Sequence, residues 1–287
     1  MTRRFLQDVG CAGALALLLL SASSHVQGQT KGQQQAAPVI PLTDPPRNWG
    51  MTVAPVFEGW EPNPDGTFSL YFGYMNRNWQ EELDMPIGPN NFFEPTPQDR
   101  GQPAHFLPRR HKQVFSIVVP KDFGQKKLVW TLSIRGSTEK VPGSLHPLQQ
   151  IDVSKDSQSG NTPPKLTNVG PDQTVTLPQP ATLSVTFSDD GLPKSGGGLE
   201  GPNVRWSKYR GPGKVTFSNS SPPLTDGKAV TSATFSEPGV YVLQVLGDDG
   251  SMAQTSQESS IPGFGCCWTM ARVTVTVKGA ASATGPK

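Results

Sequence analysis

Short stretches of alternating apolar and polar residues recur along this 287-residue chain, separated by turn signals. The clearest, residues 67–75, follows the turn Asn63-Pro64-Asp65-Gly66 and places large side chains on one face: Phe68, Leu70, Phe72 and Tyr74. A period of two is typical of a half-buried strand. The same pattern predicts strands at residues 114–119 and 128–134. In the latter, Leu128, Trp130, Leu132 and Ile134 are expected to face inward, and Thr131 and Ser133 outward.

The second half of the chain repeats this pattern at a regular spacing. Seven strands are predicted there, at residues 173–177, 181–187, 203–209, 214–218, 229–235, 239–246 and 269–277. Such spacing is typical of an immunoglobulin-type sandwich. No stretch after the N-terminal segment holds a helical period for three turns. The sequence therefore predicts an all-β protein made of two tandem immunoglobulin-like β-sandwiches after a signal peptide.

The N-terminus has the pattern of a secretory signal. Arg3 and Arg4 precede an apolar run at residues 9–20, and small and polar residues follow up to a predicted cleavage near Gly28. The apolar run is shorter than the roughly 20 residues that a membrane-spanning helix needs. We expect a secreted, periplasmic or cell-surface-associated protein without a membrane span after cleavage of the signal (residues 1–28).

Composition changes mark the remaining boundaries. Residues 29–47 are rich in Gln, Pro and Lys and predict a flexible leader, and the polar residues 154–163 predict a linker. The two sandwiches then occupy residues 48–153 and 164–279, and residues 280–287 form a tail. The proline-rich segment 86–108 is expected to be an ordered loop or an edge segment.

The second predicted domain resembles a polycystic-kidney-disease (PKD) type domain of bacterial surface proteins. The resemblance depends on residues 170–178, on Asp189-Asp190-Gly191, on Trp206 within 204–208, on Pro238-Gly239-Val240-Tyr241 and on Asp248-Asp249-Gly250. It implies an immunoglobulin-like extracellular spacer or interaction module. Independently of it, Trp206 lies where a sandwich core needs a large aromatic residue, and the hydroxyl of Tyr241 is placed to bond back across a corner.

The first predicted domain resembles a module of bacterial secreted proteins, through residues 71–78, 87–91, 99–103, 106–108 and 128–132. This resemblance implies a surface protein and no particular activity.

Charge and catalytic motifs narrow the classes of function. The formal net charge is +2 and falls to +1 when the signal is removed, so no field suited to nucleic acid exists. The sequence contains no G-x-S-x-G, no H-E-x-x-H and no phosphate-binding glycine loop. Together with the shortage of histidines, this predicts a protein that is not an enzyme and has no catalytic residues.

Two pairs of aspartates suggest a metal site. Asp189 and Asp190 follow the second strand of the second domain, and Asp248 and Asp249 follow the sixth. In an immunoglobulin topology these loops emerge at the same end, where four carboxylates favour Ca²⁺. The alternative is that the Asp-Gly pairs form turns. No other cofactor is indicated.

Cys266 and Cys267 are the cysteines that remain after signal cleavage. Adjacent Cα atoms lie about 3.8 Å apart, below the usual disulfide separation of about 4.4–6.8 Å. A strained vicinal bridge, an intermolecular bridge and two free thiols are the alternatives, and we favour an oxidised structural state, vicinal or intermolecular.

Candidate binding residues come from both halves. Residues 251–265 form a long insertion that ends near Phe264 and Trp268 and is a candidate recognition loop, with a disordered insertion as the alternative. Arg109 and Arg110 begin a basic run suited to an anionic glycan or a phosphate, or simply to a solvated loop. Three tryptophans of the first domain could stack on sugars or cap the core: Trp49, Trp60 and Trp79. The sequence thus favours a binding or adhesion module for a cell-surface glycan or protein, over a structural spacer or a hydrolase with an unrecognised site.

Overall fold

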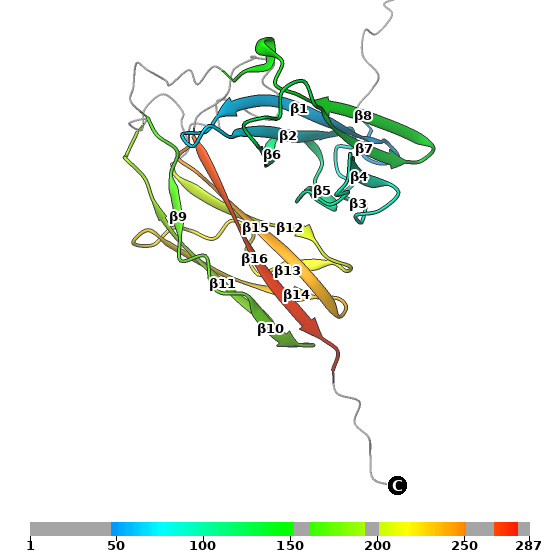
Figure 1. Ribbon diagram of the computed structural model, residues 1–287. Coiled ribbons are helices and arrows are strands. Elements are labelled where there is room, and N and C mark those ends of the chain that lie inside the picture. Colours follow the sequence, from blue (N-terminus) through cyan, green and yellow to red (C-terminus); the bar gives the residue numbers. More distant parts are fainter. Residues whose placement is uncertain (1–46, 152–160, 193–200, 251–266, 281–287) are drawn as a thin grey trace, which may run out of the picture. The chain divides into compact units, whose positions relative to one another are not determined.

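A computed structural model describes residues 47–151, 161–192, 201–250 and 267–280 (Figure 1). Within these residues the regular elements are β-strands, apart from one 3-10 turn, η1 (Pro147–Gln149). The predicted all-β fold is therefore confirmed. In the described part of the chain, no helix is long and apolar enough to cross a membrane.

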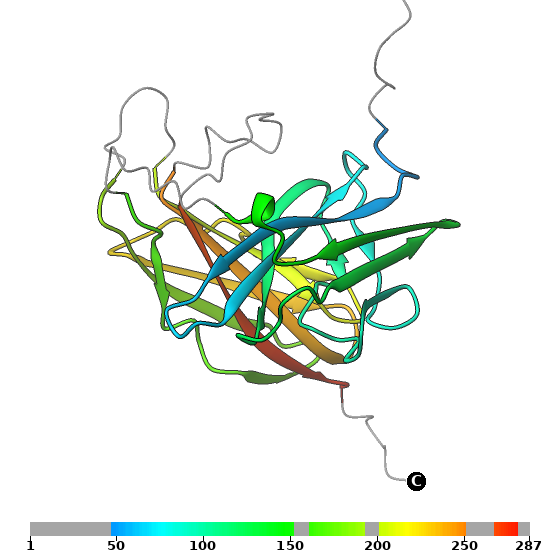
Figure 2. The same ribbon diagram turned by 45° about the horizontal axis from the view of Figure 1, so that its top comes forward.

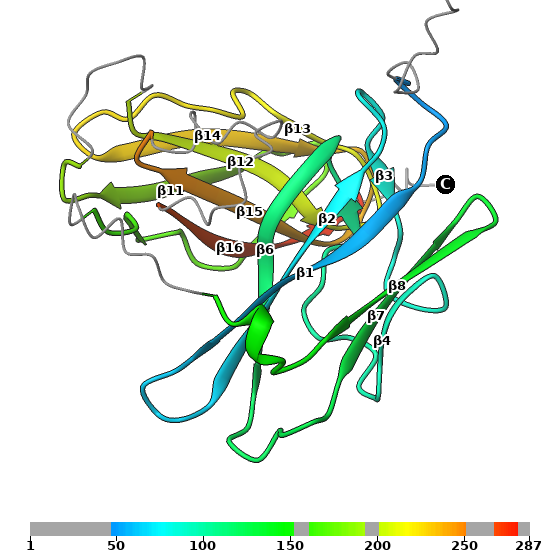
Figure 3. The same ribbon diagram turned by 90° about the horizontal axis from the view of Figure 1, so that it is seen from above.

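The first sandwich has two three-stranded sheets and one short strand pair (Figure 3). The strands of the first sheet are β1 (Val53–Pro62), β2 (Phe68–Asn76) and β6 (Arg109–Val119), in that order. Those of the second are β4 (Asn91–Glu94), β7 (Leu128–Ile134) and β8 (Ser137–Gly143). β3 (Leu83–Asp84) pairs with β5 (His105–Phe106). The proline-rich segment thus supplies an edge strand, β4, as predicted.

The second sandwich has two four-stranded sheets. One has the order β10 (Gln173–Thr176), β16 (Trp268–Lys278), β15 (Gly239–Asp248) and β12 (Asn203–Arg210). The other has the order β13 (Val215–Phe217), β14 (Lys228–Phe235), β11 (Ala181–Ser188) and β9 (Lys165–Thr167). In Figure 2 the long strands β15 (orange) and β16 (red) run side by side, in agreement with their antiparallel register.

Strand order identifies the topology of both sandwiches. Immunoglobulin domains pair their strands as A-B-E-D in one sheet and C-F-G in the other. In the second sandwich, β9-β11-β14-β13 and β12-β15-β16 reproduce these two orders. In the first sandwich, β1-β2-β6 and β4-β7-β8 reproduce A-B-E and C-F-G. The pairing of strands therefore makes both halves immunoglobulin-like.

Aromatic rings fill the core of the first sandwich. The rings of Phe93 and Trp130 stack with centroids 5.8 Å apart, and Phe72 meets Phe93 edge-on at 5.3 Å. The indole Nε1 of Trp130 donates to Oδ1 of the buried Asn91, 3.0 Å away. The Asn91 amide donates in turn to the carbonyls of Met85 and Pro103. Thr131, expected to face outward, is buried. Its sheet neighbours explain this, because it lies between Phe92 and Lys140 in register.

The core of the second sandwich is mainly aliphatic, with Trp206 and Tyr241 buried as predicted. The Tyr241 hydroxyl donates to the carbonyl of Glu237, 2.8 Å away, and accepts from the amide of Gly213. This is the tyrosine corner of immunoglobulin-like domains. Gly211 has φ of +143°, and a Cβ there would overlap the Tyr241 ring, so the corner requires glycine.

The two halves also contact each other along β12, within one compact unit of residues 45–287. The amide of Ala104 donates to the carbonyl of Tyr209, and Tyr209 is buried among the core residues of the first sandwich. Both Nη atoms of Arg210 reach the carboxylate of Asp99, at 2.9 and 2.8 Å. The edge strand β12 is thus covered by residues of the first half. Most of the predicted linker lies outside the described residues.

Candidate functional site

Two buried asparagines organise the end of the first sandwich where β2 stops. The Asn76 amide donates to the carbonyls of Glu81 and Phe106, and its Oδ1 accepts from the backbone and side chain of Asn78. The Asn78 side chain then bonds both the amide and the carbonyl of Met51. Buried amides that are fully paired hold a loop in one arrangement. Here they hold residues 77–82 against the segment before β1.

Backbone hydrogen bonds extend this attachment. The amide of Trp79 donates to the carbonyl of Arg47 at 3.0 Å, and the amides of Gln80 and Glu81 donate to the carbonyl of Asn48. The amide of Gly50 donates to the Glu81 carboxylate. Segments 47–50 and 77–81 therefore lie side by side, although about 30 residues separate them in the sequence.

This scaffold carries two exposed tryptophans. Trp49 is 59% exposed and Trp79 is 38% exposed, whereas the other described aromatic residues are buried or partly buried. The guanidinium of Arg109 lies over the Trp79 ring, 4.1 Å from its centroid, in cation–π geometry. We call Trp49, Trp79 and Arg109 the tryptophan platform. Exposed indoles on a fixed scaffold point to a binding surface, because such large apolar side chains are usually mostly buried.

The carboxylates near the tryptophan platform are already paired with arginines. Arg135 bonds Glu81 at 2.6 Å, and Arg77 pairs with Glu139. The Arg135 hydrogen bond is the main cause that lowers the pKa of Glu81 below its ordinary value. Arg109 has no carboxylate within ion-pair distance among the described residues. The local charge around the tryptophan platform is therefore positive.

The predicted basic run divides into different roles. Arg109 belongs to the tryptophan platform, but Nη2 of Arg110 donates to both carboxylate oxygens of Glu58, each 2.7 Å away. Burial lowers the pKa of His111 to about 4, and its ring stacks on Tyr74. Arg110 therefore serves the packing of the first sheet, and the solvated run that the sequence suggests is not formed.

The other candidate binding residues are dispersed. Trp60 is buried in the first core and donates through Nε1 to the carbonyl of His146, so it has no open face for a ligand. Trp268 begins β16 and is partly buried. Phe264 and the proposed recognition loop lie outside the described residues. Of the three tryptophans named as candidates, Trp49 and Trp79 lie on segments joined by backbone hydrogen bonds, and Trp60 is buried.

The aspartate loops converge in part. Burial, and then the charges of Asp190 and Asp249, raise the pKa of Asp189, so the loops after β11 and β15 lie close enough to interact. Asp190 accepts from Thr162, and Asp248 accepts from the amide of Gly250, which are turn and loop contacts. Among the described residues, no group of three or more His, Cys, Asp or Glu side chains could hold a metal ion. Calcium binding at these four aspartates stays a prediction, which a calcium titration of the melting temperature tests.

Cys267 is buried and disulfide-bonded. Cys266 lies outside the described residues. The vicinal or intermolecular pairing therefore stays a prediction.

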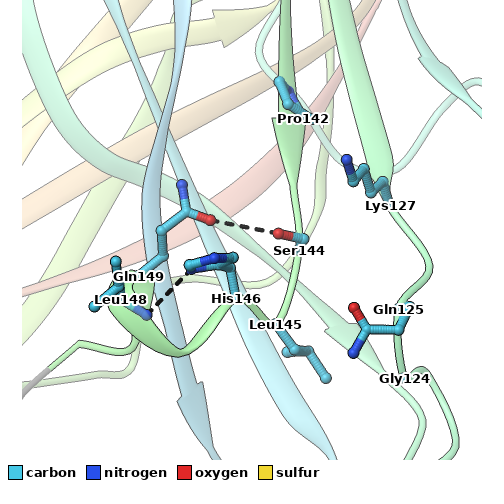
Figure 4. A pocket seen from close by; sticks show the side chains of 9 residues that line it. All are labelled: Gly124, Gln125, Lys127, Pro142, Ser144, Leu145, His146, Leu148 and Gln149. Atoms are coloured by element: carbon cyan, nitrogen blue, oxygen red, sulfur yellow. Dashed lines mark hydrogen bonds between the residues drawn. The ribbon is translucent and has the colours of Figure 1, made fainter.

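A separate pocket lies beside η1, with a volume of about 530 Å³ (Figure 4). Its polar side chains include Gln125, Lys127 and Gln149, and Gln149 bonds Ser144 at 3.4 Å. Leu148 at its rim is 90% exposed. Pockets of this size accept small ligands, and the lining of this one mixes polar and apolar side chains.

Comparison with known proteins adds little to this geometry. No protein family and no characterised relative matches the sequence. Tandem immunoglobulin repeats of Dlar align over 80% of this chain and all of theirs, at 13% identity and a TM-score of 0.27. Domains 4–9 of the surface-layer protein SbsC align over 82% of this chain and 31% of theirs, at 13% identity and a TM-score of 0.26. Fibronectin(III)-like modules of Clostridium thermocellum CbhA align over 81% and 98%, at 11% identity and 0.23. Scores this low carry no argument about function, and the immunoglobulin-like assignment depends on strand order instead.

Proposed function

We propose that this chain is an exported, non-catalytic binding or adhesion module that recognises a cell-surface glycan or protein. The observation that carries the proposal is the tryptophan platform: two exposed indoles, Trp49 and Trp79, on a scaffold fixed by buried asparagines. Exposed aromatic residues on a rigid support lose little conformational entropy when they bind. The predicted signal peptide and the resemblance of the second half to PKD-type domains support an extracellular setting.

Binding of the mature chain to cells tests this proposal. The labelled protein is incubated with envelope fractions and with a glycan array. We expect binding that Trp49→Ala and Trp79→Ala each weaken at least tenfold, because exposed aromatic anchors dominate such contacts. Val240→Ala is the matched control, since Val240 is an exposed apolar residue of the second half. Binding that is unchanged in both tryptophan variants would overturn the proposal.

A structural spacer is the second candidate, and the contacts along β12 favour it. The Arg210 pair with Asp99 and the buried Tyr209 tie the two halves together, as a spacer of fixed length requires. A spacer tolerates changes on its exposed surface. Absence of any envelope or glycan binding, with normal folding, would favour this candidate over the first.

A further inference from the structure

The backbone of Arg109 is in an uncommon conformation. Its φ is +70°, in the left-handed region that non-glycine residues seldom adopt. Such a conformation is strained, and it persists where the surroundings determine it, often at binding sites. At Arg109 the conformation occurs at the first residue of β6 and accompanies the placement of its guanidinium over Trp79.

The guanidinium retains most of its hydrogen-bonding capacity. Arginine has five N–H donors in a planar fork. The structure gives Arg109 one long hydrogen bond, from Nη1 to the carbonyl of Arg77 at 3.4 Å. Its Nε is buried without a hydrogen-bond partner. A ligand at the surface does not reach this buried Nε, so the donors open to an acceptor are those of the two Nη atoms.

The charges around this donor favour an anion. Two ion pairs lie nearby, Arg77 with Glu139 and Arg135 with Glu81, and in each the carboxylate is neutralised by its own arginine. A planar carboxylate or a sulfate matches the fork of a guanidinium and forms charge-assisted hydrogen bonds. Arg109 and the exposed Arg47 are therefore the cations of this surface that have no carboxylate partner among the described residues, and Arg109 is the one that lies over an indole.

The exposed indoles determine what carries the anion. The indoles of Trp49 and Trp79 are partly open to solvent, although the Arg109 guanidinium covers one face of the Trp79 ring. The C–H face of a pyranose ring packs on such a surface, and ring hydroxyls remain in water. A peptide anchor, by contrast, is held in a desolvated pocket, and the pocket described above lies elsewhere, beside η1.

We infer that the tryptophan platform binds an acidic saccharide, a pyranose that carries a carboxylate or a sulfate. The pyranose packs on the indoles of Trp49 and Trp79, and its anionic group accepts hydrogen bonds from Arg109. This inference rests on the proposed binding function and specifies its ligand class.

Calorimetric titration of the mature chain tests the inference. The probes are a uronic-acid hexasaccharide, a sulfated hexasaccharide, the neutral hexasaccharide of the same linkage and an Asp/Glu hexapeptide. We expect at least one acidic saccharide to bind tenfold or more tightly than the neutral one, with an affinity that falls as salt is raised. The hexapeptide should bind more weakly than that acidic saccharide.

Three variants locate the interaction. Arg109→Gln should lower affinity for the acidic saccharide at least tenfold and change affinity for the neutral one less than twofold. Arg109→Gly should have the same effect, and it keeps the fold because glycine adopts the positive φ without strain. Lys121→Gln removes an exposed cation elsewhere in the first half and should change nothing.

The outcomes separate this inference from the proposed function. Equal affinity for neutral and acidic saccharides, or no effect of either Arg109 variant, would overturn the acidic ligand and leave a glycan-binding function. Preference for the hexapeptide would overturn the saccharide and leave a protein-binding function. If no probe binds although the chain still binds envelope fractions, the inference fails alone; if the chain binds no envelope fraction either, both fail.

Discussion

The two sandwiches share a strand order but are held together differently. The first has an aromatic core joined to its loops by fully buried asparagine amides, Asn76, Asn78 and Asn91. The second has a core of Val, Leu and Ala around Trp206, with a tyrosine corner at one end. In the first half, polar side chains therefore position the backbone outside the strands. This difference explains why an exposed aromatic surface is built on the first half.

Truncation of the central tryptophan of each half should produce the largest difference in stability between the two sandwiches. Trp206→Ala should lower the free energy of unfolding by about 3–5 kcal/mol through lost packing. Trp130→Ala should cost about 1–3 kcal/mol more, because it also deprives Asn91 of a donor. The Trp206 Nε1 has no partner in the described structure, so its removal breaks no such bond.

Urea denaturation followed by circular dichroism measures both losses. Trp79→Ala is the control, because truncation of a partly exposed indole should lower the free energy of unfolding much less than truncation at either core position. Equal losses for the two core variants would contradict the distinction drawn between the halves.

Loss of the key polar group in each half is the next largest effect. Asn91→Ala leaves the Trp130 indole N–H and the carbonyls of Met85 and Pro103 without their partner, and should cost about 2–4 kcal/mol. Tyr241→Phe removes one hydroxyl and should cost about 1 kcal/mol.

The melting temperatures of the two variants measure this difference. A smaller shift for Asn91→Ala than for Tyr241→Phe would show that the asparagine does not organise the first half.

Much of this fold was predictable from alternation alone. Residues 128–134 and 181–187 were predicted as strands and match β7 and β11 within one residue, because one face of each is buried. β1 was not predicted, since its sequence contains two prolines and a glycine. β8 was missed because it is mostly polar and lies at a sheet edge.

The candidate site was predictable only in part. The three candidate tryptophans look alike in the sequence, and burial alone separates Trp60 from Trp49 and Trp79. Residues 47–50 meet residues 77–81 through backbone hydrogen bonds, which carry no side-chain signal. Asn78 joins the two segments through its buried amide, but its burial is seen only in the structure, so the sequence carries no signal for this contact.

The smallest predicted effect concerns the ionic cluster where the halves meet. His105 of β5 is buried, and its ring nitrogens contact Asp84 at 2.9 Å and Glu82 at 3.1 Å. Lys208 of β12 contacts the same Asp84 carboxylate at 2.8 Å. Burial would lower the pKa of His105, but its hydrogen bonds to Asp84 and Glu82 outweigh burial and raise that pKa above 6.5.

A raised folded-state pKa gives this histidine a defined pH window. Its contribution to stability is complete below its unfolded pKa of about 6.5 and is lost as pH rises through the higher folded value. The depressed pKa of His111 acts in the opposite sense, because its contribution is complete above about 6.5 and is lost as pH falls towards about 4. The two histidines therefore act on different sides of pH 6.5.

Chemical denaturation of the whole chain between pH 5 and 9 separates these effects. We expect His105→Gln to flatten the fall in unfolding free energy above pH 6.5, by less than about 1 kcal/mol because both carboxylates are half exposed. Below pH 6.5 the slope should persist, since His111 is unchanged. If the fall in unfolding free energy above pH 6.5 persists in His105→Gln, the ionic cluster is not the source of that fall. The contacts along β12 then depend on the Arg210 pair with Asp99 and on the packing of Tyr209.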